Sequence, residues 1–217
     1  AHLFEDPTRI MGVRDYQRGD SQRRIHWPAT ASTGQLLVKQ YQPAIARETL
    51  VCLSLNREDY ARRTWYSATE LAIVVAASIA NHVILREKLP AGLLTEAWDP
   101  LAEETVLFAL PMRSERAHLM SILESLARVE VAPDATFVDL LRRQSVKLSW
   151  GTTIAVITGR GDQALLDTLV YLRRAGFAVS LVLVQPGDPD AALQGQADLL
   201  GIPIHRVWRE ADLEAWR

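Results

Sequence analysis

From residue 48 onward, short apolar runs alternate along the chain with stretches of helical periodicity. A strand followed by a helix and a further strand is typical of a crossover unit, which lays parallel strands side by side. The sequence therefore predicts an α/β domain with a mainly parallel sheet covered by helices on both faces. The expected strands are 49–55, 92–96, 104–110, 152–158, 178–184 and 204–207.

The stretch at 64–86 is a helical pattern whose middle is almost entirely apolar, with many small side chains. A helix that is apolar on all sides is normally buried. Its apolar run at 71–80 is shorter than the ~20 residues that a helix needs to cross a bilayer. We therefore expect a buried helix of the α/β domain.

Polar residues and glycine mark the ends of further helices. We expect Ser114 to cap the helix that follows it, and Asp134 to cap a helix at 136–149. Asp162 is expected to cap another helix, and Gly176 follows two arginines, as a glycine at a helix C-terminus does.

The charge balance argues against a nucleic-acid partner. The chain carries 24 Lys and Arg against 26 Asp and Glu, a net charge of −2. The charge is uneven, since residues 1–47 carry +3 and the remainder −5. A nucleic-acid-binding domain needs a broader basic surface than this. The asymmetry is more typical of a polar interface between proteins.

Cys52 is the only cysteine and lies within an apolar run. An internal disulfide is therefore impossible, which suits a reducing compartment. Buried thiols keep a high pKa, so we expect Cys52 to be a core residue and not a nucleophile. The sequence motifs of α/β-hydrolases, P-loop nucleotide-binding proteins and zinc proteases are absent.

The first 46 residues carry a dense motif of glycine, arginine and aromatic side chains at fixed offsets. Gly19 and Asp20 form a turn pair within it, because glycine accepts a positive φ and aspartate can bond to nearby backbone N–H groups. Residues 34–42 alternate as a strand does, and Pro43 ends the pattern. We expect an extended arm at 1–46, followed by the α/β domain at 47–217.

The residues that define the motif are Gly12, Arg14, Tyr16, Gly19, Asp20, Arg23, Ile25, Trp27, Ala31, Gly34, Leu36, Val38 and Lys39. This motif resembles the signature of a bacterial and archaeal family, domain of unknown function number fifty-eight, known as MoxR-associated proteins with a von Willebrand factor A-like domain. One departure is Arg18, where the family usually has proline.

The resemblance implies a von Willebrand factor A-like, doubly wound fold after the arm. It also implies a protein partner, a MoxR-type AAA+ ATPase that acts in complex assembly or metal insertion. Family members usually carry two membrane-spanning helices ahead of the motif. We therefore expect this chain to be the cytoplasmic part of a membrane-anchored protein, tethered through a segment that the chain itself lacks.

The resemblance places a metal-ion-dependent adhesion site at the strand ends, where A-like domains use Asp-x-Ser-x-Ser, a threonine and a later aspartate. Here Ser54, Asn56 and Glu58 occupy the first motif, Thr136 matches the threonine, and Gly159 stands in place of the later aspartate. A hard cation needs carboxylate oxygens, and most of them are missing. We expect no cofactor, or weak Mg²⁺ binding at most, and these residues become candidates for partner contacts.

Two roles remain open for the arm. Tyr16, Ile25 and Trp27 can hold the arm against the α/β domain, while Arg14, Asp20, Arg23 and Trp27 can instead present a protein-binding surface. The alternative function for the whole chain is a metal-dependent ligand-binding protein or a small-molecule enzyme that uses the strand-end loops.

A glycine-rich turn at 159–164 raises the possibility of a dinucleotide site, since it reads Gly-x-Gly-x-x-Ala. However, Asp162 places negative charge where the helix N-terminus would receive a pyrophosphate, and the next strand ends in Gln185 and not in an acidic residue. The turn is better explained by tight closure between a strand and a helix.

Overall fold

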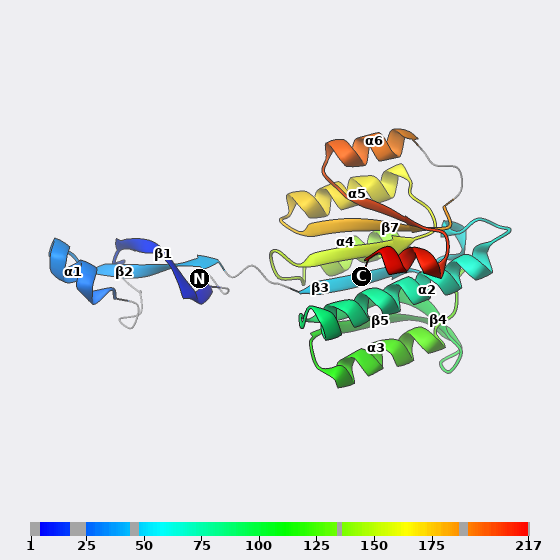
Figure 1. Ribbon diagram of the computed structural model, residues 1–217, viewed down its shortest axis with the longest axis horizontal. Helices are drawn as coiled ribbons and strands as arrows, with labels where there is room; N and C mark the ends of the chain where they lie inside the picture. Colours follow the sequence, from blue (N-terminus) through cyan, green and yellow to red (C-terminus); the bar gives the residue numbers. More distant parts are fainter. Residues whose placement is uncertain (1–4, 18–24, 44–47, 134–135, 187–190, 217) are drawn as a thin grey trace. The chain divides into compact units, whose positions relative to one another are not determined.

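The computed structural model describes residues 5–17, 25–43, 48–133, 136–186 and 191–216 (Figure 1). The chain divides into two compact units, Ala1–Ile45 and Ala46–Arg217. Gly19, Asp20, Arg23 and Asp134, which the sequence singled out, lie outside the described residues.

The first unit is built on two antiparallel strands, β1 (Glu5–Asp15) and β2 (Leu37–Pro43). Within its described part, Ile25 and Val38 are buried and form an isolated bridge to one another. The segment expected to be an extended arm also contains a short helix, α1 (Trp27–Thr33), between the two strands.

Local capping explains this helix. The Nδ1 atom of His26 accepts a hydrogen bond from the backbone N–H of Ala29 at 3.1 Å, and a proline stands in the first turn, where it costs no hydrogen bond. Gly34 ends the helix in the left-handed conformation, at φ 72°, and its N–H bonds to the Thr30 carbonyl. The 64% exposed Trp27 begins the helix and leaves its ring largely uncovered.

The second unit has the predicted α/β architecture. Its sheet has the order β5-β4-β3-β6-β7-β8, and only β5 runs antiparallel to its neighbour. Because β3 lies between β4 and β6, the strand order reverses there, as in a doubly wound sheet. The strands are β3 (Thr49–Ser54), β4 (Ala91–Asp99), β5 (Glu104–Arg113), β6 (Thr153–Thr158), β7 (Ala178–Val184) and β8 (Ile204–Val207).

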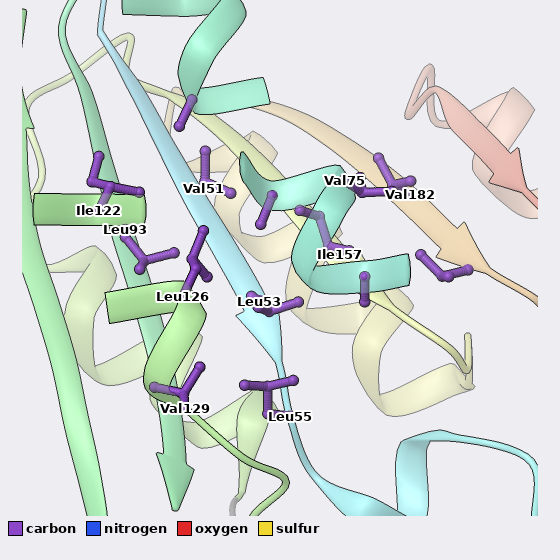
Figure 2. Close-up of a cluster of buried hydrophobic side chains, with 14 of the residues drawn as sticks. Val51, Leu53, Leu55, Val75, Leu93, Ile122, Leu126, Val129, Ile157 and Val182 are labelled. Atoms are coloured by element: carbon purple, nitrogen blue, oxygen red, sulfur yellow. The ribbon is translucent and has the colours of Figure 1, made fainter. Parts of the chain in front are cut away.

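Helices cover both faces of this sheet, with one apolar cluster under each layer. Figure 2 shows the first cluster, where Val51 and Leu53 of β3 meet Val75, Ile122 and other helix side chains. The helices on this face are α2 (Trp65–Asn81), which continues as a π-helical turn (His82–Arg86), and α3 (Arg116–Arg128), with the C-terminal 3₁₀ helix η4 (Glu210–Trp216) against α2. The opposite face carries α4 (Phe137–Ser145), α5 (Gln163–Arg174) and α6 (Ala191–Leu199).

The helix Trp65–Arg86 is, within the described residues, the one helix long and apolar enough to cross a membrane. Half of its most apolar window is buried, and Ala72, Val75, Ala76 and Ala80 are fully enclosed between the sheet and neighbouring helices. These contacts are those of the buried core helix expected from the sequence.

Helix ends follow the predictions in part. Asp162 caps α5 as expected, and Gly176 follows that helix with φ 99°. The prediction that Ser114 caps α3 is wrong. The N-cap residue is Glu115, whose backbone carbonyl accepts the first hydrogen bonds of the helix. Cys52 is fully buried, and burial raises the pKa of its thiol well above the ordinary value, so its expected role as a core residue is confirmed.

Candidate functional site

A cavity of about 230 Å³ lies at the carboxyl ends of β3 and β6, where the strand order of the sheet reverses. Ligands of open α/β sheets bind at this position, because the loops from the two neighbouring strands diverge to opposite faces. The loops after both strands and the start of α4 supply the walls. The lining residues are Asn56, Asp59, Thr136, Phe137, Val138, Asp139, Thr158, Arg160, Asp162 and Leu165.

The floor of the cavity is a tightly bonded turn after β3. The buried Ser54 hydroxyl donates a hydrogen bond to the Asp59 carboxylate, and the Tyr60 hydroxyl donates to the Ser54 carbonyl at 2.6 Å. Gly159 lies against this turn so closely that an added Cβ would stand 2.4 Å from the Tyr60 ring. Only glycine fits here, so Gly159 has a packing role.

Asn56 fixes the direction in which the chain leaves β3. Its side-chain oxygen accepts a bond from the backbone N–H of Glu58 at 3.2 Å, which caps the 3₁₀ turn η2 (Arg57–Asp59). Asn56 also forms a parallel bridge with Ala132. This pairing brings the segment that leads to Thr136 alongside the loop, so Asn56 and Thr136 both line the cavity.

The start of α4 forms a second wall. Thr136 is the N-cap residue, yet its side chain makes no capping hydrogen bond. Phe137 and Leu165 are buried and give the cavity an apolar side, while Asp139 projects from the first turn of α4 and is exposed. The wall therefore combines hydrocarbon surface with a carboxylate.

The loop after β6 forms the third wall. The Thr158 hydroxyl lies 3.4 Å from the backbone N of Arg160, and Asp162 accepts a bond from the Leu165 N–H at 2.9 Å. The guanidinium of the exposed Arg160 forms no hydrogen bond or ion pair with any described residue. This loop therefore contributes the Asp162 carboxylate, which is already hydrogen-bonded to the backbone, and the Arg160 guanidinium, which is not hydrogen-bonded to any described residue.

Asp59 is the electrostatically unusual group of the cavity. Burial raises the pKa of its carboxyl above the ordinary value, and the hydrogen bond from Ser54 opposes that shift. The nearby Asp162 raises the pKa further, Arg160 lowers it, and Glu58 contributes a smaller increase. The charged form of Asp59 is therefore incompletely compensated.

The structure brings part of the predicted site together. Asn56 and Thr136 line the cavity, and Ser54 lies beneath it with 1% of its surface exposed. Gly159 packs behind the wall, while Glu58 is exposed and outside the lining.

Sequence reasoning missed Asp59, Asp139 and Arg160 as parts of this site. Asp59 stands one position beyond the 54–58 motif that was compared with the adhesion site, and its proximity to Ser54 depends on the intervening 3₁₀ turn. Asp139 lies in the first turn of α4, three residues after Thr136. This short spacing from a predicted site residue could have indicated that Asp139 lies at the same edge of the sheet.

The arm residues lie in the first unit. Gly12, Arg14 and Tyr16 belong to β1 or follow it directly, and the Tyr16 N–H bonds to the Leu36 carbonyl at 2.9 Å. Trp27 begins α1. Their roles in partner binding stay predictions.

Within the described residues, no group of three or more His, Cys, Asp or Glu side chains is arranged to hold a metal ion. The Ser54 hydroxyl, first in the compared motif, donates a hydrogen bond to the Asp59 carboxylate, and its oxygen accepts a long bond of 3.4 Å from the Asn56 backbone N–H. Among the described residues, the carboxylates that a hard divalent cation would need are therefore not grouped around one point.

Solved structures with a similar fold include domains of the von Willebrand factor A type. An aerotolerance-related membrane protein from Bacteroides fragilis is 13% identical, with a TM-score of 0.54, over 77% of this chain and 94% of that one. A von Willebrand factor type A structure from Catenulispora acidiphila is 10% identical, with a TM-score of 0.51, over 82% of this chain and 42% of that one. The fold of the second unit is therefore A-like, as the sequence predicted.

A pilus adhesin, SpaC from Lactobacillus rhamnosus, is 10% identical, with a TM-score of 0.54, over 81% of this chain and 29% of the adhesin. The chain thus spans less than half of the length of this adhesin and of the Catenulispora protein. The comparison with curated proteins found no match.

A family model matches residues 12–189, which begins at Gly12 of the arm motif and extends through most of the A-like unit. This match covers well over half of the sequence and includes the cavity and all of its lining residues. The chain belongs to the family described as protein of unknown function DUF58.

Proposed function

We propose that this chain is a non-catalytic protein-interaction module that binds a partner protein at the carboxyl-end edge of its sheet. The observation that carries the proposal is the cavity between the loops that follow β3 and β6. Its accessible groups, Asn56, Thr136, Asp139 and Arg160, come from the loop after β3, the start of α4 and the loop after β6, and line the same cavity. The pilus adhesin with the same fold is named for attachment, which agrees with a binding role.

The chemistry of the cavity supports binding over catalysis. Ser54 is bonded to a carboxylate but is 1% exposed, so a substrate cannot reach its hydroxyl. Burial raises the pKa of the Tyr60 hydroxyl, which holds that group in its protonated, unreactive form. Cys52 is fully enclosed. A nucleophile with a base beside it, as covalent catalysis requires, is therefore not offered by these groups.

The partner that we propose is a MoxR-type AAA+ ATPase, with the chain acting as its adaptor in complex assembly at the cytoplasmic face of the cell membrane. The family resemblance supports this partner. The Bacteroides fragilis structure with the same fold is named as a membrane protein, which agrees with that location.

The test is a binding measurement between the purified full-length protein and the MoxR-type ATPase of the same organism, with ATP and Mg²⁺ present. Asp139→Asn and Arg160→Ala change exposed lining groups without disturbing a described hydrogen bond of their side chains. We expect each to weaken binding by about tenfold or more.

Glu124→Gln and Arg143→Ala are the matched controls, because both residues are exposed on helices and lie outside the cavity lining. Both controls should bind as the wild type does. Equal binding by all four variants would place the contact elsewhere, and no binding by the wild type would remove the ATPase as partner.

A further inference from the structure

We propose that the cavity receives a cationic side chain of the partner protein, a lysine ammonium or an arginine guanidinium, held by Asp59, Asp139 and Asp162. The inference rests on the proposed function and specifies the chemistry of the partner. It is carried by the size of the cavity, its mixed lining and its charge.

The lining has the two kinds of surface that a long basic side chain needs. Phe137, Val138 and Leu165 contribute hydrocarbon, and Phe137 and Leu165 are 6% and 4% exposed. Lysine and arginine bury an aliphatic stem along apolar surface and keep their charged end with polar partners. The apolar wall at the start of α4 and α5 can hold the stem, with the carboxylates around it to meet the charged end.

The charges of the lining favour a cation. Three carboxylates and one guanidinium line the same cavity. The guanidinium, on Arg160, is exposed, and the Asp162 carboxylate also accepts the Leu165 N–H that caps α5. Asp59 forms one side-chain hydrogen bond, from Ser54, and no ion pair with any described residue. Burial, Asp162 and Glu58 raise the pKa of its carboxyl by more than Ser54 and Arg160 lower it, so its charge is only partly compensated. A basic group placed here supplies the missing counter-charge.

The size of the cavity selects a side chain over a cofactor. Its volume of about 230 Å³ falls below the roughly 300–1,000 Å³ of small-molecule and cofactor sites. A hard metal ion needs several direct oxygen ligands at ~2.0–2.6 Å, and among the described residues no three His, Cys, Asp or Glu side chains are grouped to supply them. Ammonium and guanidinium groups instead donate several N–H bonds to carboxylates that need not share one coordination sphere.

The experiment is a selection from a random peptide library displayed on phage, with the full chain as bait and no added divalent cation. We expect the wild type to enrich peptides with Lys or Arg at one fixed position. The dissociation constant of an enriched peptide should rise about tenfold or more when that residue becomes norleucine or glutamine. Asp139→Asn should produce a similar loss, while Glu124→Gln should not.

A second measurement uses the pH dependence of binding by the same peptide. Because a bound cation favours ionised Asp59, affinity should fall as the pH is lowered and Asp59 takes up a proton. Asp59→Asn should reduce that dependence, because Asp139 and Asp162 still carry ionisable carboxyls. If Asp59→Asn fails to fold, the loss of peptide binding in Asp139→Asn tests the proposal instead. The Asp139 side chain is exposed and makes no described hydrogen bond, so that variant should fold.

The possible results separate this inference from the proposed function. If the selection enriches acidic peptides whose binding depends on Arg160, the proposal of a cationic side chain is wrong. The proposed function of the cavity in protein binding is then still supported. Binding that appears only with added Mg²⁺ and disappears with EDTA would also overturn the cationic side chain, in favour of a metal-assisted contact. Peptides whose binding is unchanged in every cavity variant would count against both proposals.

Discussion

Ser54 and Asp59 face one another across the turn after β3, with the Ser54 hydroxyl donating its hydrogen bond to the Asp59 carboxylate. The bond ties the end of a central strand to the floor of the cavity. Ser54 stands first in the motif that was compared with the start of an A-like adhesion site. The contact therefore fixes the conformation of the loop at this edge of the sheet.

Removing this bond is expected to destabilise the domain. Ser54→Ala leaves the partly buried Asp59 carboxylate without its hydrogen-bond donor, which costs about 1–3 kcal/mol. Urea unfolding of both proteins measures the difference. Ser121→Ala is the control, because its hydroxyl bonds only to a carbonyl one turn earlier on the exposed face of α3, and its effect should stay within about 0.5 kcal/mol. Equal stability of Ser54→Ala and wild type would show that the bond contributes nothing.

Gly159 should tolerate no side chain. In Gly159→Ala the added Cβ would lie 2.4 Å from the Tyr60 ring and 2.7 Å from the Asp59 carbonyl oxygen, so the turn after β3 must move. Overpacking of this kind costs about 1–3 kcal/mol. Gly195→Ala is the opposite case, because nothing lies within 4 Å of its added Cβ and it sits in α6. That variant should gain up to about 1 kcal/mol in thermal or urea unfolding. A harmless Gly159→Ala would contradict the packing role.

Asp59 should contribute less to the stability of the domain at neutral pH than at acidic pH. Its pKa is raised in the folded protein, so the folded state binds a proton more tightly than the unfolded chain does. The stability that this provides is complete below the unfolded pKa and is lost as the pH rises through the folded pKa. Asp59→Asn should therefore be more favourable, relative to wild type, at pH 7 than at pH 4. Unfolding free energies at the two pH values measure this, and a difference of the opposite sign would contradict the assignment.

Cys52 should resist thiol reagents in the native protein. It is fully buried, and burial raises the pKa of its thiol. As the only cysteine, it gives a single reaction to follow. We expect reaction with a disulfide reagent to occur at the rate of global unfolding and to become fast in denaturant. Rapid labelling of the folded protein would show that the central strand is accessible.

The sequence predicted the sheet well because its strands are buried on both sides. A run such as Val51, Cys52 and Leu53 needs apolar residues at every position, and that pattern is visible without a structure. Helix α1 was less visible, since its cap is the unusual side chain of His26 and no described residue of the helix is buried.

The candidate site was predicted only in part, for a physical reason. Asn56 and Thr136 follow apolar elements and could be placed at the sheet edge by topology alone. The role of Asp59 depends on a 3₁₀ turn that returns its carboxylate to Ser54, and spacing along the chain does not reveal such a return. Arg160 lies in a loop whose course depends on the close contact between Gly159 and Tyr60.

The most direct test of the account is hydrogen–deuterium exchange of the full-length protein, alone and with the purified MoxR-type ATPase that we propose as its partner. The account predicts that binding slows exchange in the three cavity segments, 55–60, 136–139 and 158–162, and leaves α3 unchanged. Protection confined to α3, to β5 or to the arm, with the cavity segments exchanging as before, would contradict it.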